Sequence, residues 1–106
     1  MDLGNPKNTI EVIQKYNFAF QKKFGQNFLI DTHVLDKIIS AAGMTKEDTV
    51  LEVGPGIGTM TQRLSQAAGQ VIAVEIDTNL IPILKDTLQD CENVTVIKIG
   101  RASCRE

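Results

Sequence analysis

Three glycines within five residues form the part of this sequence best suited to bind a ligand. They lie in Glu52-Val53-Gly54-Pro55-Gly56-Ile57-Gly58, directly after a short β-branched segment. Glycine adopts backbone conformations that other residues avoid, and it lets a ligand approach the main chain closely. A helix that begins after such a turn offers unpaired N–H groups at its N-terminus. We therefore predict a ligand-binding turn with contacts at Gly54 and Gly56, although a simple tight turn is the alternative.

A carboxylate, Glu75, follows this turn at the end of a second apolar segment. The spacing of about twenty residues is the one at which an acidic side chain binds the hydroxyls of a ribose. Two neighbouring hydroxyl donors need an acceptor with two oxygens, which a carboxylate supplies. The turn and Glu75 together predict a nucleoside cofactor. A solvated strand end is the alternative for Glu75, and Asp77 is better explained as a helix cap.

The details of the turn favour S-adenosylmethionine over NAD as this cofactor. Dinucleotide sites usually follow the pattern G-x-G-x-x-G and place a pyrophosphate at the helix N-terminus. Here the pattern is G-x-G-x-G, and Glu52 lies two residues before Gly54. A carboxylate at this position repels a pyrophosphate but suits a cofactor with a sulfonium and an ammonium group. Alternatively, Glu52 orients the turn by accepting backbone N–H groups, and both roles remain open.

The elements that position these residues follow from caps and hydrophobic spacing. A helix is predicted between a capping Asp31 and Gly43, where apolar residues follow helical spacing. A shorter helix is predicted over 9–16, because Asn8 and Glu11 resemble a capping box. The segment 18–29 has no clean period and is predicted to be an ordered loop.

From residue 49 onward, strands and helices alternate. The predicted ranges are strands 49–53, 71–75 and 94–97 and helices 59–68 and 77–89. This order implies right-handed crossovers and a parallel sheet. The strands are short and almost wholly apolar, which is typical of strands covered on both faces. The predicted fold class is α/β and Rossmann-like, consisting of part of a parallel sheet with flanking helices.

Composition limits the classes of function. The chain has 106 residues and a net charge of −2, so it forms one small domain without a general electrostatic attraction for nucleic acid. Cys91, Cys104 and His33 fit no zinc pattern, so we expect free thiols and no metal. There is no signal-peptide pattern and no apolar run of about 18 residues. We therefore expect a cytoplasmic protein without a membrane segment.

A family resemblance rests on Lys22-Lys23-Phe24-Gly25-Gln26-Asn27-Phe28-Leu29-Ile30-Asp31, on the glycine turn and on Glu75-Ile76-Asp77. Together they resemble the ribosomal RNA adenine dimethyltransferases. The small-subunit type is more similar than the large-subunit enzymes that confer antibiotic resistance, which share Gln-Asn-Phe but differ on either side of it. The resemblance implies a Rossmann-like methyltransferase fold and S-adenosylmethionine-dependent dimethylation of adenine N6 in 16S ribosomal RNA.

The resemblance also implies roles for individual residues and partners. Asn27 binds the cofactor through its side chain and Leu29 through its backbone. Gly54 approaches the methionine part, and Glu75 holds the ribose. The expected partner is the RNA of the immature 30S particle, bound by a monomeric enzyme.

The chain departs from the family pattern after the third strand. The family has an aspartate after Gly100, where this chain has Arg101, and the motif that holds the target adenine is missing. Residues 99–106 look like a foreign reading frame. We therefore expect an N-terminal helix and cofactor-covering loop (1–30), a partial methyltransferase domain (31–98) and a non-native tail (99–106).

Such a fragment would contain no catalytic residue, and we expect it to be inactive alone. Its first strand would be an unpaired apolar edge, which favours aggregation. Two other hypotheses remain at this point: a fragment of a nicotinamide-dependent oxidoreductase, and an RNA-binding remnant that is not an enzyme.

Overall fold

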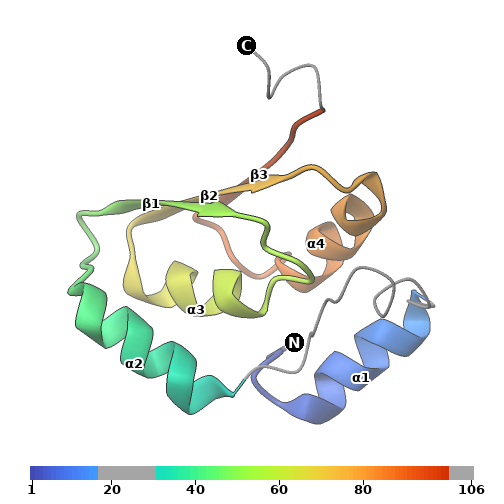
Figure 1. Cartoon of the computed structure of the whole chain (residues 1–106), viewed down its shortest axis with the longest axis horizontal. Coiled ribbons are helices and arrows are strands. Elements are labelled where there is room, and N and C mark those ends of the chain that lie inside the picture. Colours follow the sequence, from blue (N-terminus) through green and yellow to red (C-terminus); the bar gives the residue numbers. More distant parts are fainter. Residues whose placement is uncertain (17–30, 101–106) are drawn as a thin grey trace.

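The structure, a computed structural model, describes residues 1–16 and 31–100. Its centre is a parallel sheet in the order β1-β2-β3, formed by Thr49–Val53, Gln70–Glu75 and Val94–Lys98 (Figure 1). The helices are α1 (Pro6–Lys15), α2 (Thr32–Ala42), α3 (Thr59–Ala67) and α4 (Ile81–Thr87), with a 3₁₀ turn, η2 (Thr78–Leu80), before α4. The predicted parallel sheet with alternating helices is confirmed.

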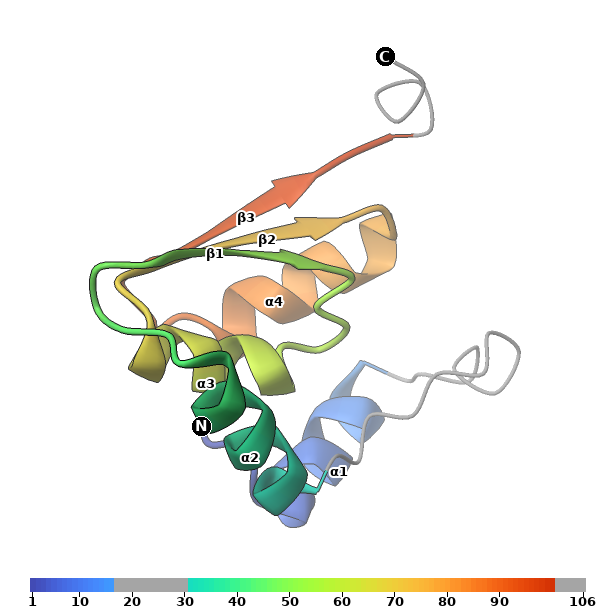
Figure 2. The same cartoon turned by 60° about the vertical axis from the view of Figure 1, so that its left-hand side comes forward.

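The four α-helices lie on one side of the sheet, as Figures 1 and 2 both show. In β2 the side chains of Val71, Ala73 and Glu75 are buried, whereas the alternate residues Ile72 and Val74 are only half-buried. The prediction that both faces of the strands are covered is therefore wrong for the described residues. Apolar side chains stand on both faces of these strands, and their sequence does not reveal whether a helix covers each face.

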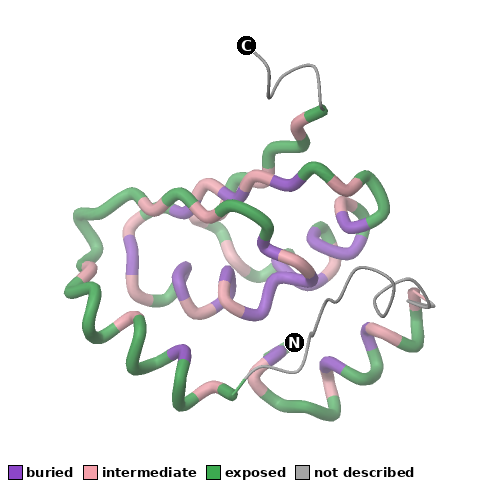
Figure 3. The backbone as a smooth tube through the Cα atoms, viewed as in Figure 1, coloured by how far each residue is buried: buried purple, intermediate pink, exposed green. Residues whose placement is uncertain are grey.

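β1 lies at an edge of the sheet, as predicted. It pairs with β2 alone among the described strands, in the register Val53↔Val74. Leu51 and Val53 are 65% and 77% exposed on the uncovered face. Figure 3 shows β1 mostly in the colour of exposed residues. The described part of the chain thus carries an apolar edge strand without a partner on its outer side.

α1 begins at Pro6 rather than at Thr9, so the predicted capping box is wrong. The side chain of Asn5 accepts the N–H of Lys7 at 3.0 Å and caps the helix. Proline suits the first turn, because its missing N–H would have no helical partner there. Asn8 instead donates its side-chain amide to a backbone carbonyl upstream of the helix. The cap therefore lies three residues earlier than predicted.

The ends of α2 and the cap at Asp77 follow the predictions. Asp31 caps α2 with its side chain, and Gly43 ends the helix in the left-handed conformation with φ +65°. Asp77 accepts a backbone N–H at 2.9 Å, but the turn that it caps is 3₁₀, and the α-helix begins only at Ile81. Pro82 lies in the first turn of α4, where it breaks no helical hydrogen bond.

Two apolar clusters hold these elements together. The first connects α3 with β2 through Leu64, Ala68 and Val71. The second joins the N-terminal segment, α1, the glycine turn and the η2–α4 segment through Leu3, Val12, Ile57, Leu80 and Ile83. Because Ile57 belongs to the glycine turn, the N-terminal segment packs directly against that turn.

Some predictions fall on residues that the structure does not describe. The predicted loop 18–29, Cys104 and residues 101–106 of the tail lie outside the described residues. Cys91 is described and is a free thiol. In residues 1–16 and 31–100, no helix has the length and apolar character needed to cross a membrane.

Candidate functional site

The glycine turn lies at the carboxyl end of β1, the edge where open α/β sheets bind ligands. Gly54, Gly56 and Gly58 have φ values of +75°, +62° and +101°, which other residues rarely adopt. The Gly54 N–H donates to the Val74 carbonyl at 2.9 Å and extends the ladder beyond β1. The Gly58 N–H donates to the Pro55 carbonyl at 3.0 Å. The backbone of the turn is therefore held at both ends.

Two of these glycines have different surroundings. Apart from Gly54 and its two chain neighbours, no described atom lies within 4 Å of the position that a Cβ on Gly54 would take, so the space beside this backbone is open. A Cβ on Gly58 would lie 2.9 Å from the hydroxyl oxygen of Thr87 and 3.2 Å from the Leu88 side chain. Gly54 is thus compatible with close approach of a ligand, whereas Gly58 is required by packing against α4.

Glu75 ends β2 and is only 5% exposed. The register Val53↔Val74 brings Glu75 next to Gly54 at the same edge of the sheet. Its Oε2 atom accepts the N–H groups of Ile76 and Asp77, both at 2.9 Å. No described residue donates to Oε1. One oxygen therefore orients the carboxylate, and within the described part of the chain the other keeps its capacity to accept a hydrogen bond.

Glu52 lies on the covered face of β1 and accepts a hydrogen bond from the Thr61 hydroxyl on α3. Burial raises the pKa of the Glu52 carboxyl; the Thr61 hydrogen bond lowers this pKa in part, and the charge of Glu75 raises it further. In the described residues Glu52 accepts no backbone N–H of the turn. The alternative that Glu52 orients the turn by accepting its backbone N–H groups is therefore wrong. Two acidic side chains thus lie near the same end of the sheet.

The start of α3 completes the site. Gly58, the residue before the helix, provides no side-chain cap, so the first N–H groups lack a side-chain partner, as predicted. Thr59 is 3% exposed, and its buried hydroxyl has no hydrogen-bond partner among residues 1–16 and 31–100. Buried polar groups in proteins are nearly always paired with protein, water or ligand. Together with Glu75, this end of the sheet offers both donors and acceptors to a polar ligand.

Sequence reasoning missed the three threonines that surround the turn, Thr59, Thr61 and Thr87. A weak local signal existed for the first two, because Thr59 directly follows the glycine turn and Thr61 comes two residues later. Two residues of the predicted site, Asn27 and Leu29, lie outside the described part of the chain, so their positions relative to Gly54 and Glu75 remain predictions. Within the described ranges, no group of three potential metal ligands is found.

Comparison with known proteins identifies related sequences. The family model described as ribosomal RNA adenine dimethylase matches residues 17–100. A protein of Lachnoclostridium phytofermentans named ribosomal RNA small subunit methyltransferase A is 69% identical over 96 residues, which are 90% of this chain and 33% of that protein. The chain spans about a third of the length of the curated relatives that it matches.

Two solved structures agree with the sequence matches. The 23S ribosomal RNA methyltransferase ErmE superimposes with a TM-score of 0.64 at 35% identity, over 70% of this chain and 30% of ErmE. A dimethyladenosine transferase from Plasmodium falciparum gives a TM-score of 0.58, also at 35% identity, over 65% of this chain and 26% of that one. The predicted methyltransferase fold is confirmed, and the chain belongs to the ribosomal RNA adenine dimethylase family.

Proposed function

We propose that this chain is the cofactor-binding part of an enzyme that dimethylates adenine N6 in small-subunit ribosomal RNA. The observation that carries the proposal is the open backbone at Gly54 beside the available Oε1 atom of Glu75, in a chain of this family. The name of the 69% identical relative supports the small-subunit RNA as substrate. Family membership disfavours the oxidoreductase hypothesis.

The described residues fit S-adenosylmethionine as the cofactor. Glu75 would accept the ribose hydroxyls, because its Oε2 atom is held by two backbone N–H groups and Oε1 is left to bind. Gly54 and Gly56 would let the cofactor lie against the backbone. The charges of Glu52 and Glu75 favour a cation nearby. When bound, the cofactor would supply a sulfonium methyl group for transfer to the adenine amine, which would lose a proton as S-adenosylhomocysteine leaves as the neutral thioether.

Asn27 and Leu29 belong to this proposal through the family resemblance. An amide side chain both donates and accepts, which suits the charged ends of a methionine. We also propose the RNA of the immature 30S particle as the partner, a monomeric enzyme and a cytoplasmic location. No residue of this chain is assigned to the target adenine, so we expect the chain alone to transfer no methyl group.

Cofactor binding is tested first on the chain itself. Calorimetry should detect binding of S-adenosylhomocysteine and no binding of NAD. Glu75→Gln keeps an oxygen for the two backbone N–H groups but removes the charge, so the Kd should rise about ten- to a hundredfold, the effect of losing a charged hydrogen bond. Exposed Glu92 provides the matched control, and Glu92→Gln should leave Kd unchanged. Binding of NAD, or equal Kd values for Glu75→Gln and the unchanged chain, would overturn the assignment.

Methyl transfer is tested in a chain of the relative's full length. We suggest a chimera in which residues 1–98 replace the matching part of the Lachnoclostridium phytofermentans relative. It should methylate adenine in immature 30S particles and leave 23S RNA unmodified. The 35% identity to ErmE makes 23S RNA the second candidate substrate. Methylation of 23S RNA alone would favour that candidate, and an inactive chimera beside an active relative would count against both.

A further inference from the structure

Ile57 is the residue of the glycine turn whose side chain belongs to an apolar core cluster. Of the five residues from Gly54 to Gly58, three are glycines and one is a proline. Pro55 and Ile57 are both buried, whereas Gly54 is exposed and the space beside its backbone is open. The Ile57 side chain is 1% exposed and packs against Leu3 and other core residues on the opposite side.

Thr87 holds the backbone of Ile57. Its hydroxyl donates to the Ile57 carbonyl at 2.7 Å, and Thr87 is 3% exposed. The peptide between Ile57 and Gly58 is planar, so fixing this carbonyl also fixes the Gly58 N–H, which closes the turn onto Pro55. The same hydroxyl oxygen occupies the space where a Cβ on Gly58 would lie. Thr87 thus controls both the orientation of this peptide and its distance from α4.

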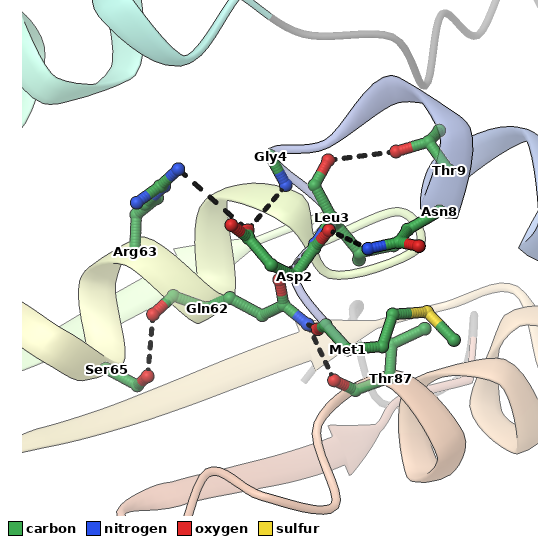
Figure 4. A network of polar contacts seen from close by, with 10 residues as sticks. All are labelled: Met1, Asp2, Leu3, Gly4, Asn8, Thr9, Gln62, Arg63, Ser65 and Thr87. Carbon is green, nitrogen blue, oxygen red and sulfur yellow. Dashed lines mark hydrogen bonds and ion pairs between the residues drawn. The ribbon is translucent and has the colours of Figure 1, made fainter.

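Gln62 in turn fixes Thr87. Its amide Nε2 donates to the Thr87 carbonyl at 2.8 Å and to the Met1 carbonyl at 2.7 Å, and its Oε1 accepts the Leu3 N–H at 2.9 Å. Figure 4 shows this side chain between the N-terminal segment and the end of α4. All three polar groups of the amide are paired, which fits a buried side chain that joins three segments.

We propose that Thr87 is a positioning residue for cofactor binding, with its hydroxyl keeping the glycine turn in the conformation that the cofactor requires. This rests on the proposed function, because the turn must be the cofactor site. Because Thr87 is 3% exposed, it would act through the Ile57 carbonyl rather than through contact with the cofactor or substrate. Gln62 supports Thr87 by donating to its carbonyl, and the N-terminal segment in turn binds the Gln62 side chain.

The test compares substitutions that separate the hydroxyl from the shape of the side chain. Thr87→Val removes the hydroxyl and keeps the volume, and Thr87→Ser keeps the hydroxyl. Ser65→Ala is the control, because it removes another buried hydroxyl bond, of 2.7 Å, to the backbone carbonyl of Gln62 within α3; the support of Thr87 comes from the Gln62 side chain instead. Gln62→Met, which removes the support for Thr87, should act in the same direction as Thr87→Val.

Binding of S-adenosylhomocysteine and the thermal midpoint Tm are measured for each variant. We expect Thr87→Val to raise Kd about tenfold, the equivalent of one buried hydrogen bond. Thr87→Ser should restore Kd to within about twofold, and Ser65→Ala should lower Tm without changing Kd. In the chimera, Thr87→Val should raise KM for S-adenosylmethionine and leave kcat unchanged.

The possible failures are distinguishable. If the unchanged chain and the chimera both fail to bind S-adenosylhomocysteine, the proposed function is wrong. If they bind it and Thr87→Val binds equally well, the positioning role is wrong. Equal losses for Thr87→Val and Thr87→Ser, or for Thr87→Val and Ser65→Ala, also contradict the role of the hydroxyl. A variant that does not fold in the 106-residue chain is measured in the chimera instead.

Discussion

Replacing Glu52 by glutamine is expected to stabilise the free protein and to weaken its binding of the cofactor. Glu52 is half-buried, and burial raises its pKa; the Thr61 hydrogen bond lowers the pKa in part, and the charge of Glu75 raises it further. The folded protein therefore holds this proton more tightly than the unfolded chain. The resulting stabilisation is complete below the unfolded-state pKa and is lost as pH rises through the folded-state pKa. At neutral pH the ionised Glu52 thus destabilises the fold.

Glutamine keeps an oxygen that accepts the Thr61 hydroxyl bond and removes the charge. We expect Glu52→Gln to raise the free energy of unfolding at pH 7 by about 1 kcal/mol. Gains of this size are typical when a residue that serves function at the expense of stability is replaced. For a domain of about 100 residues this raises Tm by about 4–8 °C. The gain should shrink toward acid pH, because the unchanged Glu52 then becomes protonated.

The same substitution should change the affinities for two ligands of different charge by different amounts. S-adenosylmethionine carries a sulfonium charge that S-adenosylhomocysteine lacks, so loss of a nearby carboxylate should weaken the first more than the second. We expect a loss of about tenfold for S-adenosylmethionine, equivalent to about 1.4 kcal/mol.

The assay is thermal unfolding followed by circular dichroism between pH 5 and 8, together with calorimetry for both ligands. Glu92→Gln, at an exposed position, is the control and should change neither Tm nor affinity. A lower Tm for Glu52→Gln at pH 7, or a gain that is the same at every pH, would refute the argument from burial. Equal losses for the two ligands would refute the electrostatic role of Glu52.

Two further predictions concern the turn and the edge of the sheet. Gly58→Ala should lower the free energy of unfolding by about 1–3 kcal/mol in chemical denaturation, because φ is +101° and a Cβ would meet Thr87 at 2.9 Å. Gly43→Ala, where nothing lies within 4 Å, should cost less; an equal cost would exclude the contact with Thr87. The double variant Leu51→Lys/Val53→Lys should reduce aggregation of the 106-residue chain in light scattering without lowering Tm, because both residues are exposed on the edge strand. Unchanged aggregation would mean that another surface drives it.

Helices, strands and their ends were predictable wherever a few adjacent residues determine the backbone conformation. Strand 49–53, the cap at Asp31 and the left-handed end at Gly43 belong to this group. The meeting of the glycine turn with Glu75 was also predictable, because parallel strands bring their carboxyl ends to one edge. The start of α1 was not, because Asn5 and Asn8 are equally good caps, and a contact of Asn8 with the N-terminal segment selects between them.

The supports of the candidate site depend instead on contacts between distant segments. Thr87 binds a carbonyl 30 residues away, and Gln62 binds an N–H 59 residues away. No local pattern marks such residues, because their partners are set by how α4 and the N-terminal segment pack against the turn. For the same reason the packing role of Gly58 and the uncovered face of the sheet became visible only in the folded chain. Neighbouring residues determine the short-range preferences of the backbone. Burial and hydrogen bonds between distant residues arise only when the helices pack on the sheet.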